Sequence, residues 1–170
     1  MMTYYTVMPS PIGEIMLSAD GEGLTGLYME FRRYEPPAQT DWVRADDNAI
    51  LVQAHAQLDE YFGGKRTDFD LPLNPSGTAF QKQVWQELCN IPYGTTISYG
   101  ELAARVGNPA ASRAVGLANG RNPISIIVPC HRVIGADGSL TGYGGGLERK
   151  ETLLAHESGL LKPWVIEEAV

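Results

Sequence analysis

Apolar and polar positions in the first third of the chain alternate in short runs. Three of these runs are rich in aromatic and β-branched side chains: residues 3–8, 12–19 and 24–31. Proline and glycine lie between the runs, and both favour turns. The pattern predicts three strands in an antiparallel meander.

A helical period follows. Apolar side chains recur every three or four residues at Ile50, Ala54, Leu58 and Tyr61, which predicts a helix over residues 47–62 that ends at the next glycine pair. Two proline-containing stretches flank this helix. Residues 35–41 are predicted to form a loop, and residues 65–76 a linker between two domains.

Helix-start patterns dominate the second half of the chain. Thr78 with Gln81, and Ser98 with Glu101, have the spacing of capping boxes and predict helices over residues 79–89 and 99–106. Asn108 is a suitable N-cap, with Pro109 at the first helical position, for a helix that runs to about residue 119. Two short helices joined by a glycine turn suggest a helix-turn-helix. A last helix is expected over residues 147–157.

The apolar run at residues 126–128 is interrupted by Pro129 and followed by Cys130, His131 and Arg132. A short apolar run is typical of a buried strand, and proline ends strands. We therefore expect Cys130 where a rigid element meets a turn. The thiolate is the nucleophilic form of cysteine, and neighbouring cations or imidazoles lower a cysteine pKa. The segment thus suggests a cysteine nucleophile.

Composition and charge narrow the function classes. The chain has 170 residues, is 44% hydrophobic and carries a formal net charge of -7. The acidity is uneven: residues 1–75 sum to -7, residues 76–162 to +2, and two glutamates near the end supply the remainder. A weakly basic second half is compatible with DNA binding through few phosphate contacts.

The chain contains two cysteines, Cys89 and Cys130, which is too few for a disulfide framework or a cysteine metal cage. No metal site is expected. Cys89 follows Trp85 by four residues on a predicted helix, so we expect it in the core. No apolar segment approaches the length of a membrane span, and the N-terminus lacks signal-peptide features. A cytoplasmic location is expected.

Other candidate residues have ordinary alternatives. A histidine base needs an orienting partner on its second nitrogen, and Glu157 is the candidate partner for His131. The ordinary alternative is that Glu157 is a solvated carboxylate at the end of a helix. Arg113 lies among small residues on a predicted helix, and an exposed surface arginine is the simpler interpretation. Tyr99 could be a core residue, and the glycine-rich loop around Tyr143 could wrap a planar ligand or a phosphate.

Several short motifs from Thr78 to Gly159 together resemble the catalytic domain of the O6-alkylguanine-DNA alkyltransferases: I-P-Y-G, S-Y-G-E-L-A, R-A-V-G-L-A-N-G, R-N-P-I, I-V-P-C-H-R-V-I and G-Y-G-G-G. The N-terminal half resembles the ribonuclease-H-like domain of the same family more loosely. The resemblance implies an α/β chain with two domains. Residues 1–75 would form the ribonuclease-H-like domain (antiparallel sheet plus helix) and linker. Residues 76–170 would form a helical catalytic and DNA-binding domain with a helix-turn-helix of winged-helix type.

The resemblance also implies residue roles. Cys130 would accept the alkyl group, His131 and Glu157 would relay protons, and Asn122 would brace the active-site turn. Arg113 would replace the flipped base in the duplex, and Tyr99 would help to rotate the 3′ phosphate and contact the guanine edge. The positions matched to DNA contacts are Tyr99, Arg113, Gln81, Ala111 and Ser112. The remaining matched positions would line the substrate pocket: Tyr143, Val133, Gly144, Gly145 and Lys150.

The activity implied is irreversible, single-turnover transfer of an alkyl group from O6-alkylguanine, and also from O4-alkylthymine, in duplex DNA to Cys130. No cofactor is required, duplex DNA is the expected partner, and the protein is expected to act as a monomer. Two other classes stay open on the residues alone. A helix-turn-helix regulator or lesion sensor would not need Cys130 and His131, and a cysteine hydrolase would not need Arg113 or Tyr99.

Overall fold

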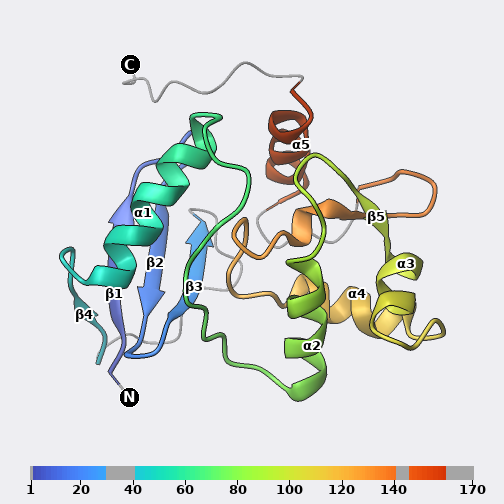
Figure 1. The fold of residues 1–170 in the computed structure, drawn as a ribbon, viewed down its shortest axis with the longest axis horizontal. Coiled ribbons are helices and arrows are strands. Elements are labelled where there is room, and N and C mark those ends of the chain that lie inside the picture. Colours follow the sequence, from blue (N-terminus) through green and yellow to red (C-terminus); the bar gives the residue numbers. More distant parts are fainter. Residues whose placement is uncertain (1, 30–40, 141–145, 160–170) are drawn as a thin grey trace.

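The computed structural model describes residues 2–29, 41–140 and 146–159 (Figure 1). The N-terminal half contains a four-stranded sheet with the strand order β3-β2-β1-β4. The strands are β1 (Tyr4–Met8), β2 (Ile15–Ala19), β3 (Leu24–Met29) and β4 (Val43–Arg44). The pairs β1–β2 and β2–β3 are antiparallel, which confirms the predicted meander. The pairing of β4 parallel to β1 was not predicted.

Helix α1 (Ala49–Phe62) packs across one face of this sheet (Figure 1). Asn48 caps its first turn by accepting hydrogen bonds from two backbone amides, so the helix begins two residues later than predicted. The buried side chains of α1 lie at helical spacing: Leu51, Ala54, Leu58, Tyr61 and Phe62. The predicted loop over residues 35–41 lies outside the described residues except for Asp41.

The predicted linker is attached to the sheet along part of its length. The amide of Leu24 donates to the carbonyl of Pro72 at 2.8 Å, and the amide of Asn74 donates to the carbonyl of Leu24 at 2.7 Å. The edge strand β3 also reaches the second half, because the amide of Leu27 donates to the carbonyl of Pro123 at 2.9 Å. These backbone bonds pair the otherwise open edge of β3.

The second half is mainly helical and contains α2 (Ala79–Leu88), α3 (Tyr99–Arg105), α4 (Ser112–Gly120) and α5 (Leu147–Glu157). A two-stranded parallel sheet joins β5 (Ile97–Ser98) to β6 (Val133–Ile134). Both halves of the Thr78–Gln81 capping box form. At α3 Ser98 caps the amide of Glu101, but the Glu101 carboxylate pairs with Arg105 at 3.1 Å instead.

Helices α3 and α4 pack together and form the predicted helix-turn-helix, but α4 starts later than the sequence indicated. Asn108 and Pro109 lie in a turn in which the amide of Ala111 donates to the carbonyl of Asn108, at 2.9 Å. Asn-Pro also favours turns, and here the turn displaces the N-cap to Ala111.

Two further expectations were wrong. Residues 126–128 form a turn instead of a strand, with Ile126 at a φ of 72°, an unusual conformation for a β-branched residue. Burial of Ile126, Ile127 and Val128 explains the apolar run without any strand. Cys89 is exposed rather than in the core, because it caps the end of α2 one position beyond the buried residue Leu88.

No helix within the described residues is long and apolar enough to cross a membrane.

Candidate active site

Cys130 begins a single 3-10 turn, η1 (Cys130–Arg132), directly after the buried turn. The side chain of Asn122 braces this segment: its Nδ2 donates to the carbonyl of Val128 at 2.8 Å, and its Oδ1 accepts from the amide of Ile124 at 3.0 Å. Asn119 on α4 donates weakly to the carbonyl of Cys130, at 3.4 Å. The backbone around the thiol is therefore held by two asparagine side chains.

The thiol itself is almost inaccessible, since Cys130 is 5% exposed. Burial raises its pKa, and this outweighs the opposite effects of hydrogen bonds to Asn122 and Ser125 and of the positive charge of Lys150. The expected lowering of the pKa by neighbouring cations is thus not the net result. The resting residue is a neutral thiol that needs a base before it can attack.

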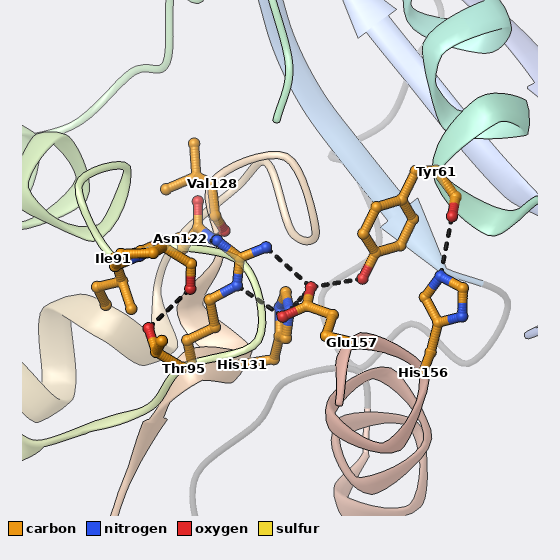
Figure 2. A network of polar contacts seen from close by, with 10 residues as sticks. Tyr61, Ile91, Thr95, Asn122, Val128, His131, His156 and Glu157 are labelled. Carbon is orange, nitrogen blue, oxygen red and sulfur yellow. Dashed lines mark hydrogen bonds and ion pairs between the residues drawn. The ribbon is translucent and has the colours of Figure 1, made fainter. Parts of the chain in front are cut away.

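His131 meets Glu157 as the sequence suggested. The imidazole Nε2 lies 2.7 Å from Oε2 of Glu157, at the C-terminal end of α5, and both side chains are buried (Figure 2). Burial lowers the pKa of His131 against the opposing effect of Glu157. A neutral ring with its proton on Nε2, facing the carboxylate, leaves Nδ1 as a proton acceptor. Nδ1 is buried and has no partner among the described residues.

Arg132 is a site residue that the sequence analysis did not assign. Its Nε donates to Oε1 of Glu157 at 2.7 Å, and a second guanidinium nitrogen donates to Oε2 at 2.9 Å. The third nitrogen donates to the carbonyl of Ile91 at 2.7 Å, and the guanidinium carbon lies over the Tyr93 ring, 5.7 Å from its centroid. Such bidentate pairing is the strongest form of ion pair between side chains. A buried carboxylate at a helix C-terminus requires a cation, and that requirement could have pointed to Arg132.

Tyr61 was also missed. Its hydroxyl, at the end of α1, donates to Oε2 of Glu157 at 2.6 Å (Figure 2). Burial opposes ionisation of Glu157, but the hydrogen bonds from His131 and Arg132 and the positive charge of Arg132 hold its pKa well below the usual range. The carboxylate is therefore charged at neutral pH. A buried tyrosine hydroxyl needs a polar partner, but α1 alone does not indicate which one.

Two of the predicted pocket residues lie beside the active-site turn, the segment of residues 126–132 that carries Cys130. Val133 is buried, and the Lys150 ammonium on α5 donates to its backbone carbonyl at 2.7 Å. Lys150 is fully buried, and burial lowers its pKa while nearby Cys130 opposes the change. The other predicted pocket residues, Tyr143, Gly144 and Gly145, lie outside the described residues.

Four of the five predicted DNA-contacting residues lie on or at the start of α3 and α4, and Gln81 lies in the first turn of α2. Arg113 is exposed on the first turn of α4, and Ala111 and Ser112 mark the start of that helix. Tyr99 on α3 is partly buried against Gly116, where an added Cβ would lie 3.6 Å from the tyrosine ring. Gln81 uses its side-chain oxygen to accept from the amide of Thr78.

No group of three or more His, Cys, Asp or Glu side chains within the described ranges could hold a metal ion. The arrangement therefore offers a buried thiol, a neutral imidazole oriented by a charged carboxylate, and a neighbouring ammonium. These groups can deprotonate the thiol and support its attack on an electrophile.

Comparison with known proteins identifies the domains. The ribonuclease-like domain model of 6-O-methylguanine DNA methyltransferase matches residues 3–75, and the DNA binding domain model of the same family matches residues 79–159. These assignments agree with the two-part α/β fold expected from the sequence.

Curated relatives and solved structures resemble almost the whole chain. The methylated-DNA--protein-cysteine methyltransferase of Mycobacterium leprae is 54% identical over 156 residues, covering 92% of this chain and 93% of the relative. That of Methanosarcina barkeri is 51% identical over 163 residues, covering 94% and 99%. The crystal structure of Mycobacterium tuberculosis OGT in complex with DNA superposes with a TM-score of 0.84 at 50% identity, covering 94% of this chain and 95% of that one. On these grounds the chain belongs to the 6-O-methylguanine DNA methyltransferase family.

Proposed function

We infer that this protein repairs DNA by direct reversal, transferring an alkyl group from O6-alkylguanine in duplex DNA to its own Cys130. One observation carries the inference: the buried Cys130 thiol lies on a braced turn beside the buried His131–Glu157 pair. A regulator with a helix-turn-helix would gain nothing from this arrangement. The family membership and the DNA-bound structure of a close relative support the same activity.

The first step activates the thiol. Within the described residues no hydrogen bond joins the Cys130 thiol directly to the His131 ring, so a water molecule would carry the proton from sulfur to Nδ1. Glu157 stabilises the imidazolium that results, because it stays charged and lies against Nε2. Thiolate formation thus occurs at the moment of attack and not in the resting protein.

The second step is a single displacement. The Cys130 sulfur forms a bond to the alkyl carbon as the bond between that carbon and O6 of guanine breaks, and the departing guanine takes a proton. Lys150 and Tyr99 are the candidate groups for assisting that protonation. The thioether product does not hydrolyse, so each protein molecule reacts once and needs no cofactor. O4-alkylthymine presents the same kind of carbon–oxygen bond and is the second expected substrate.

The lesion must leave the base stack to reach a buried thiol, which costs a few kcal/mol. We propose that α4 enters the groove and that Arg113, exposed on its first turn, fills the vacated space. Ala111 provides no side-chain cap for α4, which favours contact between the first-turn amides, including that of Ser112, and a DNA phosphate. Gln81, at the start of α2, would contact the DNA beside them.

We further propose that residues 1–75 and 76–170 are the two domains, and that the protein acts in the cytoplasm, where reducing conditions keep Cys130 free.

Intact-mass measurement tests the activity. After incubation with a duplex containing O6-methylguanine, the protein should gain one methyl group in place of one hydrogen, in a 1:1 ratio to lesion, and peptide mapping should place it on Cys130. Unmodified guanine duplex is the control. An unchanged mass, or repeated turnover without modification of the protein, would exclude the proposal.

A further inference from the structure

The carboxylate of Glu157 receives hydrogen bonds from two halves of the molecule. His131 approaches it from the active-site turn, and Tyr61 approaches from α1 in the ribonuclease-like half (Figure 2). Arg132, next to His131 in the chain, also donates to it. The Tyr61 hydroxyl and the His131 ring share the same oxygen, Oε2, at 2.6 Å and 2.7 Å. Tyr61 is fully buried, so water does not compete for its hydroxyl.

The position of this hydroxyl is fixed by its surroundings. The residue before Glu157 on α5, His156, hydrogen-bonds the backbone carbonyl of Tyr61 at 2.8 Å and packs its ring edge-on at 5.1 Å. Phe69 and Tyr93 pack on the same tyrosine ring, at 5.6 Å and 6.1 Å between centroids. The end of α1 is therefore joined to the end of α5 by both backbone and side chain.

We propose that Tyr61 is a positioning residue through which the ribonuclease-like half sets the basicity of His131. The proposal rests on the function inferred above, in which His131 is the base. A carboxylate that accepts several hydrogen bonds attracts each donor less strongly. The Tyr61 hydroxyl therefore reduces the negative charge available to His131, which keeps the imidazole neutral and ready to accept the thiol proton.

Other titratable and charged groups face the same site and stay in place when the Tyr61 hydroxyl is removed. Arg132 on η1 and Lys150 on α5 disfavour a charged His131, and Cys130 lies next to it in the chain. Tyr93, after α2, and His156, on α5, flank Tyr61. A change confined to the Tyr61 hydroxyl should therefore report on the Glu157–His131 contact.

The test is an NMR titration of the His131 ring nitrogens in the full-length wild-type protein and in Tyr61→Phe, with the resonance assigned through His131→Gln. Phe keeps the ring contacts and removes the hydroxyl. We expect the titration midpoint of His131 to rise by about half a pH unit or more, since Glu157 then stabilises the imidazolium more strongly. Tyr93→Phe is the matched control, because no described residue hydrogen-bonds its hydroxyl, and it should leave the midpoint in place.

Transfer kinetics provide a second measurement. The acid limb of the pH–rate profile with free O6-benzylguanine should move to higher pH by the same amount in Tyr61→Phe. A purely structural role for Tyr61 would lower the rate at every pH without moving the limb, and that outcome would overturn the proposal. So would an unmoved or lowered His131 midpoint.

If Tyr61→Phe does not fold, a second variant tests the proposal, and it is expected to shift the His131 midpoint in the opposite direction. Replacing Tyr61 by 3-fluorotyrosine keeps the ring and the hydroxyl but makes the phenol a stronger donor, so the His131 midpoint should fall. An unchanged or raised midpoint would contradict the proposal. The titration needs no substrate, so absence of alkyl transfer in the wild-type protein would remove the proposed function without deciding this result.

Discussion

At the scale of single residues, the site depends on how one buried charge is satisfied. An unpaired carboxylate in the interior is very unfavourable, and Glu157 is stable there because His131, Arg132 and Tyr61 all contact its oxygens. The same contacts orient the imidazole, which the proposed function uses for proton transfer. Stability and chemistry are thus coupled at Glu157.

Removal of Arg132 tests this coupling. Arg132→Ala leaves the Glu157 charge without its cation, and we expect a loss of about 3–5 kcal/mol in unfolding free energy, measured by urea denaturation. Arg105→Ala is the control, since that arginine forms an exposed pair with Glu101 and its loss should have little effect. Equal losses in the two variants would contradict a stabilising role for the Arg132–Glu157 pair.

The two cysteines should behave differently. Cys130→Ser should abolish alkyl transfer yet retain binding to O6-methylguanine duplex, because a hydroxyl is far less nucleophilic at neutral pH. Cys89→Ser should keep full transfer, since Cys89 is exposed at the end of α2. Intact mass and gel-shift measurements on both variants check this, and methyl found on Cys89 in the Cys130→Ser protein would refute it.

The pKa shifts of His131 and Glu157 predict how stability depends on pH. The pKa of His131 is lowered in the folded state, so below its ordinary value of 6.5 the unfolded chain binds a proton that the folded protein does not. Stability should therefore fall as pH drops below about 6.5. Glu157, whose pKa is also lowered, should add a second loss below its ordinary value of 4.5. Melting temperatures from pH 8 to about pH 3 test both phases, and His131→Gln should lack the first.

At the scale of elements, α4 combines a buried face with an exposed one. Val115, Ala118 and Asn119 face the interior, whereas Arg113 and Leu117 are exposed. Leu117 is 67% exposed, so apolar as well as charged side chains lie on the outer face of this helix. The exposed face of α4 therefore suits a partner surface, which the proposed function identifies as DNA.

The proposed role of Arg113 predicts a substrate-dependent defect. Arg113→Ala should slow repair of O6-methylguanine in a duplex by about tenfold or more, because only duplex substrate requires base flipping at a few kcal/mol. Reaction with free O6-benzylguanine should stay near wild type. Arg121→Ala, at the opposite end of α4, is the control. Equal defects on the two substrates would rule out the role.

At the scale of the whole molecule, the two halves are joined next to the active-site turn and along α5. Leu27 on β3 bonds to Pro123, just before the turn, and Tyr61 on α1 bonds to Glu157. Arg149 on α5 donates to the carbonyl of Ile12, in the first half, at 2.9 Å. A change at Cys130 should therefore affect the stability of both halves.

Alkylation is the natural form of that change. An added carbon on the 5% exposed Cys130 enters a packed turn, and overpacking typically costs about 1–3 kcal/mol. We expect the stoichiometrically methylated protein to melt at a lower temperature and to bind DNA more weakly than the free protein in the same buffer. Cys130→Ser is the control for loss of the thiol alone. An equal or higher melting temperature after methylation would show that the turn has space to spare.

Much of this protein could be predicted from local sequence. The meander, α1, α5 and the Thr78 cap follow from alternation, helical period and side-chain-to-backbone bonds between near neighbours. The short motifs also led to Cys130, to the Asn122 brace and to the contact between His131 and Glu157.

Tertiary structure decided the rest. Whether residues 126–128 form a strand or a turn depends on what they pack against, because an apolar run is buried equally well in both. The start of α4 and the exposure of Cys89 depended on local backbone geometry that composition does not specify. The partners of Glu157 lie 25 residues away at Arg132 and 96 residues away at Tyr61. Sequence patterns act over a few residues, whereas the satisfaction of a buried charge is settled only when distant elements come together.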